Sequence, residues 1–162
     1  MKIDREVLIS RLRYDRDTGE FVWRKNYRNR LVGEIAGSID GDGYLAIKVN
    51  GRIYRAHHLA WMYVHREWPG GVVDHIDGDK RNNAIANLRD VSVAGNSQNQ
   101  RAAHRDNANG LLGVDYNKTK GRYRARIQTS GMRVTLGGFD TAEEAHKAYI
   151  EAKRVKHETC TI

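Results

Sequence analysis

Cysteine is almost absent from this sequence, since Cys160, close to the C-terminal end, is the only one. A single cysteine excludes a disulfide within the chain and a zinc site built from cysteine ligands. No apolar run approaches the roughly 20 residues that a membrane-spanning helix needs, and no signal-peptide pattern opens the chain. We therefore expect a protein of a reducing, cytoplasmic compartment without a membrane partner.

Acidic residues are also fewer than basic ones, 20 against 28, which leaves a formal net charge of +8 at pH 7. A surplus of this size favours a polyanionic partner, and nucleic acid is the usual one, although an ordinary basic surface has the same composition. Hydrophobic residues make up 40% of the 162 residues and charged residues 30%, which is typical of a folded protein. The length suits one ordinary domain or two small ones.

Short helix and strand patterns alternate over the first seventy residues. They predict a helix over 4–13, strands over 21–23, 45–49 and 53–56, and a helix over 57–66. Asp4 can cap the first helix. Asn50-Gly51 is the strongest short signal for a hairpin between two strands.

The segment from Val72 to Gln100 carries the chemistry. A predicted strand ends on Asp74 and His75, whose side chains point to opposite faces because they are neighbours. A second strand over 88–93 returns the chain, and a polar helix over about 94–104 could bring Asn96 or Asn99 back to the strand end. A carboxylate and an amide oxygen suit Mg²⁺, and a neutral histidine beside it could deprotonate water.

The residues between the two strands have a simpler explanation. Asp77, Gly78 and Asp79 suit an ordinary turn. They also faintly resemble a calcium loop, but the spacing and the terminal glutamate of such a loop are missing.

As a whole, the pattern resembles the HNH nucleases of the ββα-metal fold, in particular phage and intron-encoded homing endonucleases. The matching residues are Asp74-His75, Asp77-Gly78, Asn82-Asn83, Asn87-Leu88-Arg89 and Asn96. Upstream, residues 54–61 (YRAHHLAW) resemble the family's H-R-L-V-W stretch, with His58 where arginine is usual. The resemblance covers roughly residues 5–104.

The resemblance implies a role for each matched residue. His75 is the general base that reaches the scissile phosphate, and Asn87 braces the loop and helps to orient the histidine. Asp74 and Asn96 hold one Mg²⁺ or Mn²⁺ ion, although many HNH enzymes have a second histidine where Asn96 stands. His57 supports the fold. The implied reaction is hydrolysis of a DNA phosphodiester to 5′-phosphate and 3′-hydroxyl ends.

A separate pattern occupies the last fifty residues. Strands are predicted over 113–117, 122–128 and 132–138, followed by a helix that Thr141 and Glu144 can cap. Arginines alternate with apolar residues along the second strand and continue on the third, so one sheet face carries Arg122, Arg124, Arg126 and Arg133. Such a face would repel itself without a polyanion, and a sheet can enter the major groove.

This segment resembles the ethylene-response-factor type DNA-binding domain. The matching residues are Gly113-Val114, Gly121-Arg122-Tyr123, Ala125-Arg126-Ile127, Leu136-Gly137, Phe139-Asp140-Thr141, Glu143-Glu144-Ala145 and Ala148-Tyr149. The resemblance implies that Arg122, Arg124, Arg126 and Arg133 contact DNA. The chain departs from the family on the first strand, where Asp115 and Asn117 stand in place of frequent arginines.

The sequence thus predicts an α+β chain of two domains. An HNH nuclease domain of the ββα-metal (His-Me finger) type spans 1–104, with its core over about 72–104. A linker over 105–109 leads to the ethylene-response-factor type domain over 110–158, a three-stranded antiparallel sheet packed on one helix.

The predicted function is a metal-dependent DNA endonuclease, phage-encoded or homing, that acts on double-stranded DNA in the cytoplasm of a bacterial host. The alternative is a DNA-binding protein with a decayed nuclease fold that cuts nothing. RNA is a third option that charge does not exclude, but a groove-reading sheet favours DNA. No small-molecule substrate is expected. No dimer signature is visible, and the oligomeric state stays open, with a monomer as one option.

Overall fold

The computed structural model of the protein describes residues 2–26, 29–98, 103, 107, 109–129 and 131–157, with the backbone alone at 94, 97 and 98. Contacts divide the chain into two compact units, Met1–Ser92 and Val93–Ile162. Asn99, Cys160 and most of the predicted linker lie outside the described residues. The domain boundary at 105–109 therefore stays a prediction.

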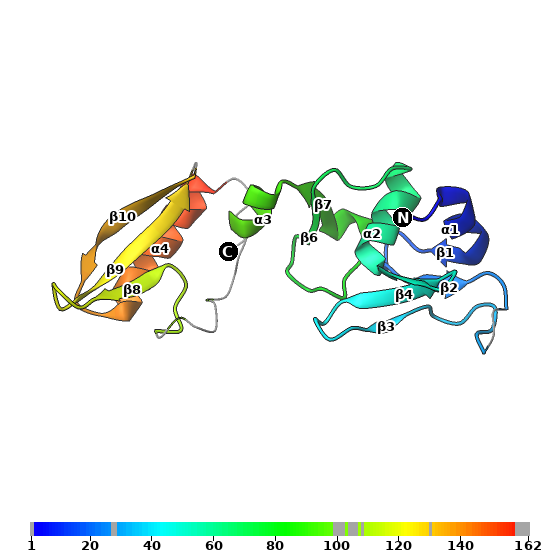
Figure 1. Cartoon of the computed structure of the whole chain (residues 1–162), viewed down its shortest axis with the longest axis horizontal. Coiled ribbons are helices and arrows are strands. Elements are labelled where there is room, and N and C mark those ends of the chain that lie inside the picture. The colour runs from blue at the N-terminus through cyan, green and yellow to red at the C-terminus, as the bar shows by residue number, and fades with distance from the viewer. Residues whose placement is uncertain are drawn as a thin grey trace. The chain divides into compact units, whose positions relative to one another are not determined.

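Small antiparallel sheets and the helices against them make up unit 1 (Figure 1). Its elements are α1 (Arg5–Arg11), β1 (Leu12–Tyr14), β2 (Phe21–Trp23), β3 (Ser38–Ile39), β4 (Leu45–Val49), β5 (Arg52–Arg55), α2 (Ala56–His65), β6 (Val72–His75), the 3-10 helix η1 (Ile85–Asn87) and β7 (Leu88–Val91). β1 pairs with β2, β4 lies between β3 and β5, and β6 pairs with β7. The strands predicted over 21–23 and 45–49 are confirmed at those bounds.

The first helix is shorter than the sequence predicts. Asp4 caps it as expected, since its side chain accepts a hydrogen bond from the Glu6 amide at 2.8 Å. The helix ends at Arg11 because the chain becomes extended at Leu12, with φ −126°. Leu12 and Tyr14 then enter the core while Arg13 between them is exposed, so strand burial overrides the helical pattern.

The predicted hairpin between β4 and β5 is confirmed. Asn50 and Gly51 both have positive φ, 48° and 82°, which is the conformation that a tight two-residue turn needs. α2 follows directly and ends where Arg66 adopts the left-handed conformation, with φ 66°.

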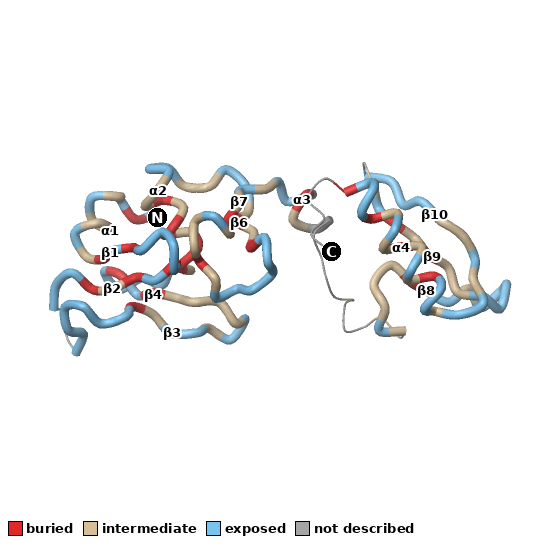
Figure 2. The backbone as a smooth tube through the Cα atoms, turned by 180° about the vertical axis from the view of Figure 1, so that it is seen from behind, coloured by how far each residue is buried: buried red, intermediate tan, exposed pale blue. Residues whose placement is uncertain are grey.

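The core of unit 1 lies between the helices and the strands. Fully buried apolar side chains come from α1, β1, β2, β4 and α2: Leu8, Leu12, Phe21, Ile47 and Leu59 (Figure 2). α2 also contacts β6. This packing brings the first turn of α2 beside the end of the strand that carries Asp74 and His75.

Unit 2 contains α3 (Val93–Gln98), β8 (Val114–Asn117), β9 (Arg122–Thr129), β10 (Met132–Phe139) and α4 (Ala142–Lys156). β9 is the central strand of an antiparallel sheet in the order β10-β9-β8, and α4 packs on the sheet (Figure 1). Thr141 and Glu144 form the predicted capping box. Ala125 and Ile127 of β9 pack against Ala145 and Tyr149 of α4.

The α+β fold class is thus confirmed, with a three-stranded sheet on one helix in unit 2. Within the described residues, no helix combines the length and the apolar composition needed to span a membrane.

Gly113 allows the close approach of the chain before β8 to α4. Its φ is +77°, and a Cβ atom there would lie 2.0 Å from Cδ2 and 2.3 Å from Cγ of Tyr149. We expect Gly113→Ala to lower the free energy of unfolding by about 3 kcal/mol, because overpacking adds to the cost of a left-handed alanine. Thermal or urea unfolding measures the change.

Gly131 offers a matched control, since its φ is also +77° but nothing lies within 4 Å of a built Cβ. Gly131→Ala should therefore cost only the conformational part, about 1 kcal/mol. Equal losses for the two variants would show that the Tyr149 contact is unimportant.

Candidate active site and nucleic-acid interface

The hairpin of β6 and β7 holds the two residues on which the candidate active site rests. Asp74 lies opposite Arg89 and His75 opposite Leu88 in the strand register. The side chains of Asp74 and His75 face opposite sides, as the sequence predicts. His75 is only 4% exposed, whereas Asp74 is half-buried.

Asp74 is held by an arginine on the neighbouring strand. Nε and Nη2 of Arg89 both donate to Oδ2 of Asp74, at 3.0 and 2.8 Å. Both charge-assisted bonds converge on one oxygen and fix the orientation of the carboxylate. Sequence reasoning recognised Arg89 as a motif residue but assigned it no role.

The imidazole of His75 is oriented by Asn83. Nε2 of His75 lies 3.3 Å from Oδ1 of Asn83, while Nδ2 of Asn83 donates to the carbonyl of Arg81 at 2.9 Å. The second bond fixes which end of the amide faces the ring. Because an amide oxygen only accepts, Nε2 must carry the proton, and the lone pair of the neutral ring is on Nδ1.

Asn87 closes the loop between the two strands. Its Oδ1 accepts from the amide of Asp77 at 3.0 Å, and its Nδ2 donates to Oδ1 of Asp77 at 2.9 Å and to the carbonyl of Asn82 at 2.8 Å. These bonds hold Ile76 to Asn83 in a fixed shape behind His75. A catalytic contribution from Asn87 stays a prediction.

Asp77 and Asp79 shape the same loop. Burial raises the pKa of Asp77, but hydrogen bonds from Asn82 and Asn87 outweigh it and hold the pKa below its usual range. Asp77 therefore accepts these bonds as a carboxylate, and Asp79 accepts from the Arg81 amide. The turn interpretation thus accounts for both acids. No cluster of three or more His, Cys, Asp or Glu side chains suited to a metal occurs in the described part of the chain.

Aromatic rings surround the other sides of His75. The His57 ring, from the first turn of α2, lies 5.1 Å from it edge-on, and Tyr44 lies 6.1 Å away. Burial, followed by the charges of His58 and His75, lowers the pKa of His57 to about 3. Nδ1 of His57 is buried without a hydrogen-bond partner among the described residues. His57 is therefore neutral and fills space.

The two predicted metal ligands lie in different units of the chain. Asp74 belongs to unit 1, whereas Asn96 is half-buried on α3 of unit 2. Their joint coordination of an ion stays a prediction. The sequence also predicts that His75 reaches a phosphate, and the 4% exposure leaves only a small part of its surface open to one.

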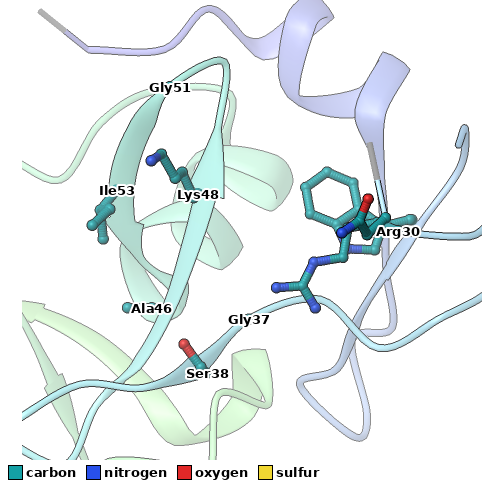
Figure 3. Close-up of a pocket in the computed structure, with 9 residues that line it drawn as sticks. Arg30, Gly37, Ser38, Ala46, Lys48, Gly51 and Ile53 are labelled. Carbon is teal, nitrogen blue, oxygen red and sulfur yellow. The ribbon is translucent and has the colours of Figure 1, made fainter. Parts of the chain in front are cut away.

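A cavity of about 570 Å³ opens elsewhere in unit 1, between the chain before β3 and the outer face of β4 and β5 (Figure 3). Arg30 and Lys48 give it positive charge, and Trp23 and Ile53 contribute apolar surface. None of its lining residues is a predicted site residue. Sequence patterns did not predict it, because only the fold brings Arg30, from the segment between β2 and β3, to the same cavity as Lys48 of β4.

In unit 2, the alternation along β9 is confirmed, with Ala125 and Ile127 buried and the arginines on the other face. The expectation that this face repels itself was wrong, because carboxylates lie among the arginines. Asp115 accepts from both Arg124 and Arg126, at 2.5 and 2.8 Å. On the same face, Asp140 accepts a hydrogen bond from Arg122. Arg133 is exposed and has no acidic partner within the described ranges.

The shifted pKa of His57 predicts how stability depends on pH. In the unfolded chain His57 takes up a proton below about pH 6.5, but in the folded chain it stays neutral down to about pH 3. The free energy of unfolding should therefore fall by about 1.4 kcal/mol per pH unit from this group as pH drops through that window. Urea unfolding at pH 7, 6 and 5 measures the slope.

His57→Asn should flatten this slope, because asparagine takes up no proton. The exposed His65 at the end of α2 is the matched control, and His65→Asn should leave the slope as it is. An unchanged slope in His57→Asn would mean that His57 is not the residue that titrates on unfolding.

Comparisons with known proteins match two separate segments of the chain. Residues 54–98 match the family described as HNH endonuclease, and residues 110–158 match the AP2 domain. Protein 3.8 of Escherichia phage T7 is 30% identical over 90 residues, which cover 55% of this chain and 74% of that protein. A solved structure described as DNA binding and cleavage by the HNH homing endonuclease I-HmuI is similar at a TM-score of 0.46 and 20% identity, over 98% of this chain and 95% of that one. The chain belongs to the HNH endonuclease family and carries an AP2 domain behind its HNH segment.

Proposed function

We propose that the protein is a metal-dependent endonuclease that hydrolyses phosphodiester bonds in double-stranded DNA and leaves 5′-phosphate and 3′-hydroxyl ends. The observation that carries the proposal is the arrangement of His75. The Nε2 proton of His75 is bound by Asn83, so the lone pair of the ring is on Nδ1. The preceding residue on β6, Asp74, supplies a carboxylate.

In this proposal His75 acts as the general base. Nδ1 takes a proton from a water molecule, whose oxygen attacks phosphorus while the bond to the 3′ oxygen breaks. The positive charge that develops on the ring is stabilised by Asn83, since Nε2–H points at its amide oxygen. The 3′ oxygen leaves in line with the attacking water and is released as a hydroxyl after it gains a proton.

The donor chemistry fits a divalent cation. HNH nucleases generally use one, and Asp74 offers the hard carboxylate oxygen that Mg²⁺ or Mn²⁺ prefers. Asn96 would add an amide oxygen, and a single bound ion would stabilise charge on the leaving 3′ oxygen. Arg89 holds the Asp74 side chain in one orientation, so this carboxylate is already oriented before an ion binds.

DNA is the partner that both matched families indicate. In our proposal the arginine-bearing face of β8, β9 and β10 contacts the duplex, while unit 1 cuts it. The similarity to a phage T7 protein supports a phage-encoded enzyme that works in the bacterial cytoplasm.

A binding-only protein is the second candidate, and two observations favour it. His75 is 4% exposed, and the carboxylate of Asp74 is already paired with Arg89. Plasmid DNA incubated with Mg²⁺ or Mn²⁺, with and without a chelator, separates the two candidates. Nicking or linearisation that the chelator stops supports the nuclease, and intact plasmid under all metals supports the binding protein.

His75→Ala should lower the rate of DNA cleavage at least 100-fold, because the variant has no group to deprotonate the water. Affinity for DNA, measured by fluorescence anisotropy with chelator present, should change less than twofold. His65→Ala is the control, because His65 is exposed on α2 and should keep full cleavage. Undiminished cleavage by His75→Ala would remove His75 as the base.

Arg133→Gln should flatten the dependence of log K on log salt by about one unit, because Arg133 is exposed and free to contact a phosphate. Lys156→Gln is the control, since Lys156 is exposed on α4, which packs on the opposite face of the sheet. An unchanged slope in Arg133→Gln would mean that this part of the face does not touch DNA.

A further inference from the structure

Asp115 lies at a position of β8 where the resemblance to ethylene-response-factor type domains predicts an arginine. Its Oδ2 accepts from Nη2 of Arg124 at 2.5 Å and from Nη2 of Arg126 at 2.8 Å. Asp115 lies directly opposite Arg124 in the register, and Arg126 lies two residues further along β9 on the same face. One carboxylate oxygen therefore joins two guanidinium groups in the middle of the sheet.

The cluster does not satisfy all of its own polar atoms within the described part of the chain. Oδ1 of Asp115 and Nε of Arg124 are both buried and lack hydrogen-bond partners among the described residues. A pair that served stability alone would satisfy both atoms, because an unmet polar group in a buried position is unfavourable. Each guanidinium also offers five donors, and its hydrogen bond to Asp115 uses one of them.

The surroundings of the cluster leave it open to a partner. On β10, Gly138 lies opposite Arg124, and a Cβ built on Gly138 would have no atom nearer than 3.9 Å. Arg124 and Arg126 therefore have the Asp115 carboxylate beside them on β8. On the other side, on β10, Arg124 has only Gly138, which has no side chain. The ion pair of Arg122 with Asp140 differs, because both side chains are at least half exposed, at 50% and 80%.

We propose that Asp115 is a specificity-determining residue, which orients Arg124 and Arg126 for base edges in the major groove and keeps them from phosphates. The inference rests on the proposed DNA-binding role of this face. A guanidinium held by a carboxylate presents its remaining donors in a fixed direction, which suits the paired acceptors O6 and N7 of guanine. The carboxylate also repels phosphate oxygens, so binding to arbitrary sequences is weakened.

The test measures discrimination with the full-length protein in chelator, so that no DNA is cut. Wild-type protein first selects duplexes from a randomised 20-bp pool. Affinities for the selected duplex and for an unselected random duplex are then measured for wild type, Asp115→Asn and Asp140→Asn, across a series of salt concentrations.

Asp115→Asn should bind random duplex about tenfold more tightly than wild type at low salt, with a salt slope steeper by about one to two units. Its preference for the selected duplex should fall about tenfold or more. Asp140→Asn should change the preference less than twofold, because its partner Arg122 lies at the exposed start of β9. Arg124→Gln should reduce the preference while leaving the salt slope nearly unchanged.

Three results would overturn the inference. The first is an equal gain of affinity for both duplexes in Asp115→Asn, which would reduce Asp115 to a simple negative charge. The second is no effect on either duplex, with a native unfolding transition, which would make the pair structural. The third is a wild-type protein that binds no duplex, and only this result would also remove the proposed DNA-binding role of the face.

Discussion

The hydrogen bond between Asn83 and His75 is the contact on which the candidate active site depends. Asn83 is 1% exposed, and its three polar partners come from different parts of unit 1. Its side chain bonds to His75 and to the Arg81 carbonyl, and its own carbonyl accepts from the hydroxyl of Tyr14 at 2.7 Å. Because an unmet polar atom inside a protein is unfavourable, all three partners must be in place together.

The Tyr14 bond ties the loop before β7 to the first strands of the chain. The amide of Ile85 also donates to the carbonyl of Arg16 at 3.0 Å. Gly19 makes this approach feasible, since a Cβ there would lie 2.3 Å from the Ala84 nitrogen. The orientation of one imidazole thus depends on a turn more than fifty residues earlier, and a change at Gly19 would reach His75 through the loop.

Local features of the fold could be predicted from the sequence because they depend on neighbouring residues. The hairpin at Asn50-Gly51 and the capping box at Thr141 are set by backbone conformations that few residue types adopt. The opposite facing of Asp74 and His75 follows from the pleat of any strand. The end of α1 could not be read in this way, because Leu12 leaves the helix to bury its side chain among residues distant in the chain.

The long-range pairings were not predictable for the same reason. Nothing in the spacing of Asn83 shows that its amide faces His75, because that direction is set by Arg81 and Tyr14. The arginine face was predicted correctly from the alternation along β9, but the aspartates that pair with its arginines were not predicted. Asp115 was noted as a departure from the family pattern, and its ion pairs with Arg124 and Arg126 appear only once β8 lies beside β9.

Pairing of arginine with aspartate recurs in both units and changes what the net charge means. Arg89 is bound to Asp74, Arg55 to Asp40 and Asp42, and the arginines of β9 to Asp115 and Asp140. A surplus of +8 describes attraction to any polyanion at long range, and salt screens it. A guanidinium fixed by a carboxylate contributes little to that attraction but presents its donors in a defined direction. Under the proposed DNA-binding role the two kinds of cation would have different tasks. Arg133, which has no acidic partner within the described ranges, would suit attraction to a phosphate backbone, and paired arginines such as Arg124 would suit recognition of base edges.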